Sequence, residues 1–242
     1  SCKAIRYLFS VRYYFDEVTP DNLEPEGIDL PGFSYYDTQN GFQIYKNDYA
    51  LPMGFTFDTY VSRSQWETYS ESDRCNLLLR ALVLEDDAVE TYQKDMQKLP
   101  DAVHQMSDED LLAECTERAK TACDSFTYNS KGFHATISTD HENLVFFSVP
   151  WDAGWSAEVN GEPVSIEKAD VGFMAVPVPA GDSEITFTYH TPGLKAGALL
   201  SLGGLVLFAG YLTVAGIYNK RHPNPKTESI CCVDYSTEET AN

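Results

Sequence analysis

The organisation of this chain is decided by residues 194–218, which read LKAGALLSLGGLVLFAGYLTVAGIY. After Lys195 roughly 23 residues carry no charge, and a helix that crosses a bilayer needs about 20 such residues. The alternative is a fully buried helix of a soluble protein, but the rest of the chain is too small and too polar to surround it. The stretch therefore predicts one transmembrane helix over residues 193–219, in contact with membrane lipids.

The charges beside this helix predict its direction in the membrane. Lys220 and Arg221 follow it directly, whereas Lys195 is the one basic residue close before it. Because Lys and Arg collect on cytoplasmic flanks, we expect residues 1–193 to be extracytoplasmic and residues 220–242 to be a disordered cytoplasmic tail. The protein is then located in the cell membrane.

Small residues recur four apart in the same helix. Gly197 and Ser201 form one such pair, and Ala209 and Thr213 form another. Small side chains allow helices to approach closely, which favours packing against other membrane helices over a lone anchor.

The charge of the chain is concentrated before the membrane helix. The 242 residues include 37 acidic and 17 basic ones, for a formal charge of −20. Four acidic and four basic residues follow position 194, so 33 acidic and 13 basic residues precede it. Such an acidic surface repels phosphates, and we predict no nucleic-acid partner. About 190 residues suffice for one or two domains with real cores.

The start of the chain lacks an export signal. Residues 1–15, SCKAIRYLFSVRYYF, contain neither a continuous apolar segment nor a signal cleavage site. An outer domain needs a route across the membrane. We therefore expect that Ser1 is not the natural start and that the chain is the C-terminal piece of a larger membrane protein, with upstream transmembrane helices as partners of its last helix.

The residues that carry common catalytic and metal chemistry do not form a known pattern. Of six cysteines, none shows zinc-ligand spacing, and the acidic triplet at 85–87 lacks the alternating ligands of a calcium loop. The five histidines are dispersed, and no glycine-rich phosphate loop precedes a helix. We predict no metal, no bound cofactor and no catalytic residue in this chain. A Cys115–Cys123 disulfide is one reading of the cysteines, and buried thiols are the other.

Residues 1–87 predict a small extracytoplasmic α/β segment. Apolar and aromatic patterns indicate strands at 4–15, 42–45 and 53–61, with a loop over 16–40. Ser70 and Asp73 have capping-box spacing and open a helix. Its apolar face consists of Leu77, Leu78, Ala81 and Leu82, and the acidic triplet ends it.

Residues 88–192 predict a β-sandwich, jelly-roll-like, with an inserted helix at 107–122. A strand at 89–98 precedes the helix, which Ser107 caps. Seven strands follow, at 125–129, 132–138, 143–150, 156–159, 162–167, 172–178 and 183–189. Asn160-Gly161 predicts a type I′ hairpin. The predicted fold class is thus α+β, mainly β, followed by one transmembrane helix.

Aromatic residues beside carboxylates are the candidate sugar contacts. Trp151, Asp152 and Trp155 cluster in PWDAGW, and Tyr35-Tyr36 precedes Asp37. Tryptophan offers a large amphipathic surface, and a carboxylate accepts hydrogen bonds from hydroxyls. The alternative is that Trp155 opens a strand and packs into the sandwich while Asp152 stabilises the turn.

Three blocks of the sequence together resemble one family. They are YKNDYALPMGFTFDTYVS at 45–62, FFSVPWDAGWSAEVNGEPVSIEKADVGFMAVPVPAGDSEITFTYHTPGL at 146–194, and the helix after it. They are similar to the C-terminal end of the bacterial YfhO family of polytopic membrane proteins. The match is less clear over 88–125, and the tail beyond 222 is specific to this chain.

The resemblance implies a function. Members of that family resemble GT-C-type glycosyltransferases, which transfer a sugar from a lipid-phosphate carrier to cell-wall polymers such as teichoic acids. Their catalytic carboxylate lies on a loop between early membrane helices, so this chain is expected to be a noncatalytic portion that contacts glycan or wall polymer. The alternatives are a noncatalytic carbohydrate-binding module on a single anchor and a structural cell-surface domain.

Overall fold

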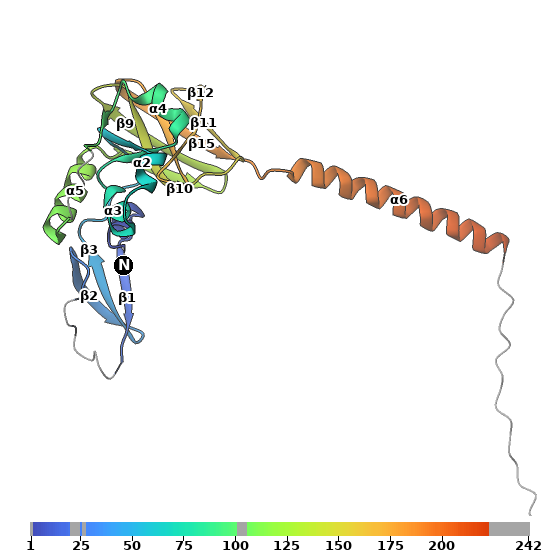
Figure 1. The fold of residues 1–242 in the computed structure, drawn as a ribbon. Coiled ribbons are helices and arrows are strands. Elements are labelled where there is room, and N and C mark those ends of the chain that lie inside the picture. The colour runs from blue at the N-terminus through green and yellow to red at the C-terminus, as the bar shows by residue number, and fades with distance from the viewer. Residues whose placement is uncertain (1, 20–24, 26–27, 101–105, 223–242) are drawn as a thin grey trace, which may run out of the picture. The chain divides into compact units, whose positions relative to one another are not determined.

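The computed structural model describes residues 2–19, 25, 28–100 and 106–222. The chain divides into two compact units, one within residues 1–190 and one within residues 191–242 (Figure 1). The second unit contains α6 (Leu194–Arg221). Most of the tail predicted at 220–242 lies outside the described residues.

The first unit is built on three sheets, so the prediction of a mainly β fold is confirmed. Sheet A has the order β1-β3-β2 and consists of β1 (Tyr13–Glu17), β2 (Phe33–Gln39) and β3 (Phe42–Asn47). Sheet B has the order β4-β10-β14-β13-β6-β5-β7 and consists of β4 (Phe55–Thr56), β5 (Thr59–Ser62), β6 (Leu82–Leu84), β7 (Gln97–Lys98), β10 (Asn143–Pro150), β13 (Glu167–Ala169) and β14 (Phe173–Val178). Sheet C has the order β12-β11-β15-β9-β8 and consists of β8 (Ser125–Asn129), β9 (Gly132–Thr139), β11 (Trp155–Val159), β12 (Glu162–Val164) and β15 (Gly181–Tyr189).

Sheets B and C form the sandwich, and an aromatic cluster fills the space between them. Phe133 and Phe187 of sheet C are stacked with ring centroids 4.4 Å apart. Phe147 of sheet B lies 5.1 Å from Phe133 and 5.3 Å from Phe187. Because successive side chains of a strand point to opposite faces, Val145 and Phe147 enter this core, whereas Leu144 and Phe146 of the same strand enter another.

The second core lies on the other face of sheet B, where short helices cover it. These are α1 (Ala4–Leu8), α2 (Arg63–Glu67), α3 (Glu71–Leu77), α4 (Asp86–Tyr92) and α5 (Asp108–Lys120). Leu8, Phe146, Leu79 and Leu111 are among its buried side chains. Sheet B is therefore buried on both faces, which explains why β10 reads as a continuous apolar run.

The capped helices follow the sequence closely. Ser107 accepts a hydrogen bond from the Asp110 N–H, and the Asp110 carboxylate accepts one from the Ser107 N–H, which completes a capping box at α5. The Ser70 side chain likewise accepts from the Asp73 N–H at the start of α3. That helix ends at Leu77, however, so the predicted apolar face beyond it is wrong. Residues 82–84 form β6 in the core instead.

The predicted type I′ hairpin at Asn160-Gly161 is present, with φ angles of 54° and 82°. A second turn of the same kind joins β2 to β3, where Asn40 and Gly41 have φ angles of 53° and 81°. The prediction of a loop over 16–40 is therefore wrong at its C-terminal part, which is β2.

Other predicted strands differ from the structure in kind. Residues 4–15 contain α1 before β1, because Ala4, Tyr7 and Leu8 are buried at helical spacing. Residues 53–61 divide into β4 and β5, which occupy different positions in sheet B. Residues 89–98 contain most of α4 and the short β7 rather than one strand.

The strand predicted at 162–167 also divides, and its two halves join different sheets. β12 pairs with β11 in sheet C, whereas β13 pairs with β14 in sheet B. The chain thus crosses from one sheet to the other at Ser165-Ile166. Sheet B contains strands from both predicted segments, 1–87 and 88–192. For example, β6 of the first segment pairs with β13 of the second.

A disulfide joins Cys2 to Cys75, across 73 residues of sequence. Of the two readings of this cysteine pair, the Cys115–Cys123 disulfide is wrong. Both residues are free thiols, with Cys115 buried and Cys123 partly buried. Cys115 packs in the core between sheet B and the helices, while Cys123 packs beside the sandwich core. Burial raises the pKa of each thiol to about 12.

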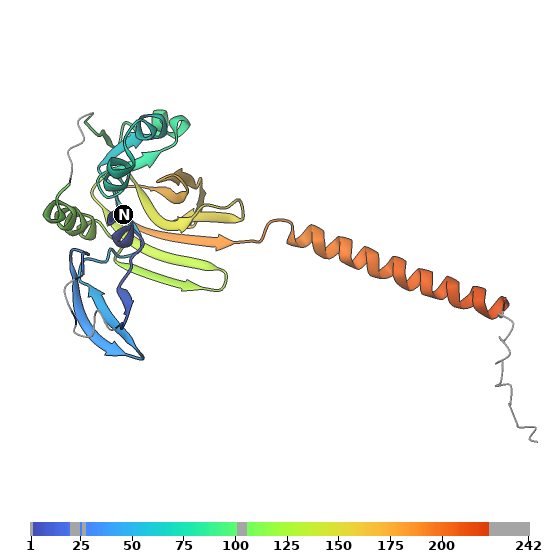
Figure 2. The ribbon, with the colours of Figure 1, turned by 60° about the horizontal axis from the view of Figure 1, so that its bottom comes forward.

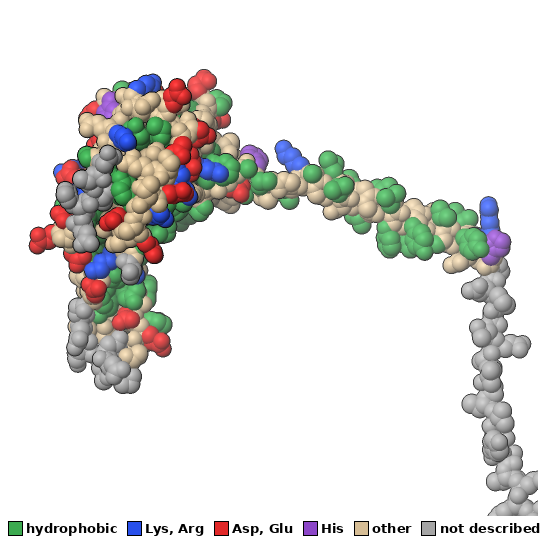
Figure 3. Space-filling model, viewed as in Figure 1, with side chains coloured by type: hydrophobic (Ala, Val, Ile, Leu, Met, Phe, Trp, Pro, Cys, Tyr) green, Lys and Arg blue, Asp and Glu red, His purple; other side chains and the backbone are tan. Residues whose placement is uncertain are grey.

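The helix α6 is the one span in the described part of the chain that is long and apolar enough to cross a membrane, with mean hydropathy 2.0. Its leucine, valine and phenylalanine side chains are all exposed, whereas acidic side chains are spread over the surface of the first unit (Figure 3). The helix is therefore a candidate transmembrane segment, as its sequence predicts.

Candidate functional site

A pocket of about 540 Å³ opens at one end of the sandwich. The β8–β9 hairpin and the end of β15 form one side of it, and these strands lie side by side in sheet C (Figure 2). The end of β10 and the turn into β11 form the other. This sandwich-end pocket is lined by Phe126, Tyr128, Asn129, Ser130, Lys131, Gly132, Phe133, Val149, Pro150, Asp152, Trp155 and Tyr189.

Trp155 is both part of the wall and part of the sandwich. It is the first residue of β11 and pairs with Tyr189 of β15, and the two rings lie 5.0 Å apart. Its indole also contacts Phe133, at 5.6 Å, and Phe187, at 6.1 Å. Because buried aromatic neighbours hold its rotamer, the wall is rigid before any ligand arrives.

Asp152 stabilises the turn beside Trp155 and also faces the pocket. Its carboxylate accepts a 2.7 Å hydrogen bond from the Gly154 N–H. The Gly154 carbonyl in turn accepts from the His190 N–H at 2.8 Å. Burial, and after it the hydrogen bond to Asp152, raises the pKa of Tyr189 above its usual value of 10.0. At neutral pH this end of the pocket presents a phenol beside a carboxylate.

Tyr128 extends the pocket into solvent. Its side chain is 82% exposed, which is unusual for so large a ring. The neighbouring Lys131 carbonyl accepts a 2.7 Å hydrogen bond from the Tyr189 N–H, which ties the tip of the hairpin to the end of β15. The arrangement offers aromatic faces, a carboxylate acceptor and an ammonium donor within one opening, a combination suited to a polyhydroxylated ligand.

The structure separates Trp151 from the other two members of its predicted cluster. Asp152 and Trp155 line the pocket, whereas Trp151 does not. The Lys168 Nζ atom lies 4.0 Å from the centre of the Trp151 ring. The backbone N–H of Trp151 donates to the Gly172 carbonyl. Trp151 therefore faces the turn between β13 and β14.

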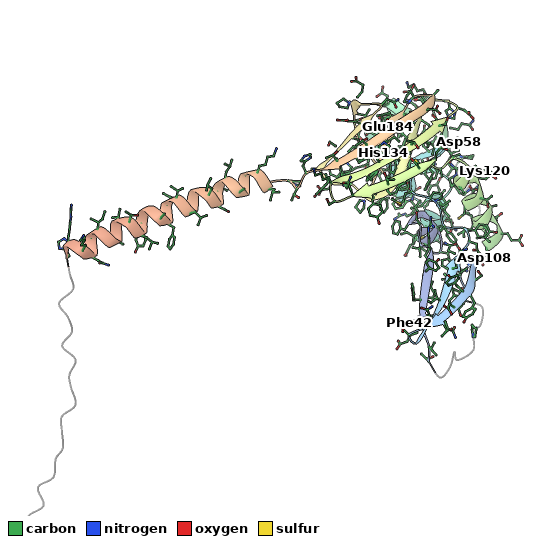
Figure 4. All side chains as sticks on the ribbon, turned by 180° about the vertical axis from the view of Figure 1, so that it is seen from behind. Phe42, Asp58, Asp108, Lys120, His134 and Glu184 are labelled. Carbon is green, nitrogen blue, oxygen red and sulfur yellow. A yellow bond between two sulfur atoms is a disulfide. The ribbon has the colours of Figure 1, made fainter. Side chains whose placement is uncertain are left out.

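Tyr35 and Tyr36 lie on β2 of sheet A and do not line the pocket. Tyr35 contacts Tyr45, and Tyr36 contacts Tyr13. Because Tyr14 is paired with Tyr45, Tyr13 and Tyr45 are on opposite faces of the sheet, and so are the two candidate tyrosines. They do not form a joint contact surface. Figure 4 shows Phe42 at the far tip of this sheet, where β3 begins.

The sequence reasoning missed several pocket residues, notably Phe126, Tyr128 and Tyr189. The available signal was the aromatic content of residues 126–133, which flank a short turn, together with the last aromatic residue before the linker to α6. No spacing rule connects these segments, since only the pairing of β9 with β15 brings them together.

Comparisons with known proteins identify the family of the chain. The family "Bacterial membrane protein YfhO" matches residues 3–107 and 102–201. An "Uncharacterized protein YfhO" of Bacillus subtilis (strain 168) is 29% identical over 121 residues, which is 50% of this chain and 13% of that protein. The chain thus matches a small part of that relative's length. No solved structure matches significantly. The family match extends over both cores of the first unit and into α6, and the chain belongs to the YfhO family of bacterial membrane proteins.

Proposed function

We propose that residues 1–193 are the extracytoplasmic C-terminal domain of a YfhO-type membrane glycosyltransferase. The whole enzyme transfers a sugar from a lipid-phosphate carrier to a cell-wall polymer of the teichoic-acid type. This domain is noncatalytic and holds a sugar unit of the polymer in the sandwich-end pocket. The observation that carries the proposal is the pocket itself, with Trp155, Tyr128 and Asp152 around one opening.

The chemistry of the pocket supports a sugar ligand. A sugar ring has an apolar face of C–H groups and a rim of hydroxyls, so it fits an aromatic wall with a nearby acceptor. Trp155 supplies a fixed wall, Tyr128 an exposed ring, and Asp152 a carboxylate oxygen. Lys131 can donate to hydroxyls or to the phosphates of a teichoic-acid-like polymer.

The connection to α6 supports a role near the membrane surface. Tyr189 lines the pocket and α6 begins at Leu194, five residues later. Five residues span at most about 17 Å, so only a short linker separates the pocket-lining strand from α6 in the sequence. A lipid-linked sugar is consumed at the membrane surface.

Two features support an extracytoplasmic position. The Cys2–Cys75 disulfide is typical of oxidising compartments. Lys220 and Arg221 at the end of α6 favour a cytoplasmic C-terminus.

The test uses wall-polymer fragments and the full chain in nanodiscs. Binding is followed by saturation-transfer NMR and titration calorimetry, and Tyr128→Ala is compared with Tyr36→Ala, which removes an exposed ring from sheet A. We expect Y128A to weaken binding about fivefold, corresponding to about 1 kcal/mol, and Y36A to leave it unchanged. Equal affinity of all three proteins, or no binding by any, contradicts the proposal.

A second function is favoured by one observation. Trp155 packs on Phe133 and Phe187, as expected if its role is structural. On that reading the domain is a structural cell-surface module. In the host, deleting the complete gene then leaves the sugar content of the wall polymer unchanged, whereas the glycosyltransferase proposal requires that content to fall.

A further inference from the structure

The pocket end of the sandwich carries a second surface, which shares Tyr128 and Lys131 with the lining of the pocket and extends beyond it. It consists of Tyr128, Lys131, Trp151, Lys168 and Val171, and we name it the basic–aromatic rim. All five residues are exposed. They come from the β8–β9 hairpin, the end of β10 and the β13–β14 turn. The backbone N–H of Trp151 donates to the Gly172 carbonyl and so joins the end of β10 to the β13–β14 turn.

We propose that the basic–aromatic rim docks on the surface of a lipid bilayer that contains anionic headgroups. Tyr and Trp gather at the level of the headgroups because their rings are apolar with one polar edge. Lysine side chains bury their methylene stems there while the ammonium group contacts phosphate. The proposal requires that α6 crosses the membrane, but it does not require that the pocket binds sugar.

Charge complementarity supports an anionic partner. The chain carries a formal charge of −20, and 33 acidic residues precede position 194. The rim nevertheless contains two exposed lysines, with the exposed Asp152 beside them. A basic patch on an acidic domain confines attraction for anionic lipid to one end of the molecule.

The backbone at Val171 holds an apolar side chain outward. Val171 has φ 74° and is 38% exposed. A β-branched residue rarely adopts a positive φ, since its Cβ crowds the backbone. The preceding Asp170 also has a positive φ, of 45°, and fixes the turn through two bonds to the Val83 backbone. The turn therefore holds an apolar valine outward, where it provides an apolar contact for a membrane surface.

The connection to α6 limits where the rim can be. The Tyr189 N–H donates to the Lys131 carbonyl, so the hairpin tip is attached to the strand that leads to α6. The five residues from Tyr189 to Leu194 reach at most about 17 Å. The hairpin tip is therefore attached to a strand that only a short linker separates from α6 in the sequence.

The test is spin-label depth measurement on the full chain in nanodiscs. The background carries C231S and C232S, because these thiols would otherwise be labelled. Single labels are placed at Tyr128→Cys, Val171→Cys and Asp140→Cys, the last an exposed control in the β9–β10 turn. We expect labels at 128 and 171 to collide preferentially with oxygen, as in a membrane interface, and the label at 140 to collide with a water-soluble nickel chelate. Aqueous behaviour at all three positions overturns the proposal.

A second measurement tests the lysines. K131Q/K168Q is compared with the parent in nanodiscs of phosphatidylcholine mixed with phosphatidylglycerol. Each lysine is expected to contribute about a fivefold factor to the docking equilibrium, so the double variant shifts it about 25-fold toward the undocked state. An unchanged oxygen preference at position 171 overturns the electrostatic basis of docking. Sugar binding measured on K168Q alone reports separately on the pocket, because Lys131 lines the pocket and Lys168 does not.

Discussion

The Asp170 carboxylate accepts a 2.8 Å hydrogen bond from the backbone N–H of Val83, 87 residues earlier, inside the core of the first unit. Its other oxygen, Oδ2, has no hydrogen-bond partner among the residues that the structure describes. Burial raises the pKa of Asp170 from 3.8 to about 8. The structure therefore holds a protonated carboxyl where β6 meets the β13–β14 turn.

Asp170→Asn should remove a pH dependence of stability. Between pH 4 and 8 the unfolded chain ionises Asp170 while the folded chain keeps it protonated. Unfolding therefore becomes easier as pH rises through this window, by up to about 1.4 kcal/mol per unit, and the effect levels off above pH 8. Asparagine keeps the acceptor for Val83, so D170N should gain stability over the parent as pH rises.

Urea unfolding followed by tryptophan fluorescence at pH 4 to 8 measures this difference. The exposed Asp182→Asn serves as the control and should change stability by less than about 0.5 kcal/mol. Parallel pH profiles for D170N and the parent would falsify the assignment of a buried protonated carboxyl.

Gly154→Ala should disrupt the wall of the sandwich-end pocket. A Cβ atom at this position would clash with the His190 carbonyl and would lie 2.7 Å from a ring carbon of Tyr189. Overpacking of this kind costs about 1–3 kcal/mol. Gly172→Ala is the matched control, because its Cβ meets open space. Thermal unfolding measures the melting temperatures of both variants, and we expect that of G154A to be lower. Equal melting temperatures would show that the turn at Gly154 accommodates the Cβ atom without a loss of stability.

Loss of the Cys2–Cys75 disulfide should destabilise the helical side of the first unit. The bond closes a loop of 73 residues, and native disulfides contribute about 2–4 kcal/mol, largely by restricting the unfolded chain. Cys75→Ser should lower the urea midpoint by a corresponding amount. Peptide mapping without reductant should find Cys2 linked to Cys75, and recovery of both as free thiols contradicts the pairing.

The direction of α6 should be visible in labelling experiments on intact bacteria that express the complete protein. A cysteine at the exposed Asp140 should react with a membrane-impermeant maleimide in intact cells, whereas a cysteine at Lys220 should react only after the membrane is permeabilised. Lys220 follows the apolar span on the side where basic residues collect. The reverse pattern of labelling would place the first unit in the cytoplasm.

The turns show which backbone conformations the local sequence predicts and which depend on distant contacts. Asn160-Gly161 predicts its turn correctly. Asn40-Gly41 has nearly the same φ angles, but it ends a segment rich in Pro and Gly that the sequence predicts as a loop. Both turns depend on residues that tolerate positive φ. Asp170-Val171 forms a turn with positive φ without that signal. The buried contact of Asp170 with Val83 stabilises it, and these two residues are 87 positions apart in the sequence.

Periodicity was informative for long elements and ambiguous for short ones. The β-rich sandwich, the helix at 108–120 and α6 are all evident from patterns of many residues. Residues 4–8 and 86–92 are helices of one to two turns. In such short segments propensity is weak, and packing against sheet B decides the conformation.

The sequence by itself determined the membrane-length helix, the mainly β character of the rest, the caps and the Asn160-Gly161 turn, because each depends on neighbours within a few residues. Only the tertiary structure decided which strands share a sheet, which cysteines pair, and which aromatic residues surround the pocket. Trp155 meets Tyr189 and Phe133 through strand pairing between distant segments. Those contacts depend on how two cores are packed at once, and no local pattern encodes that arrangement.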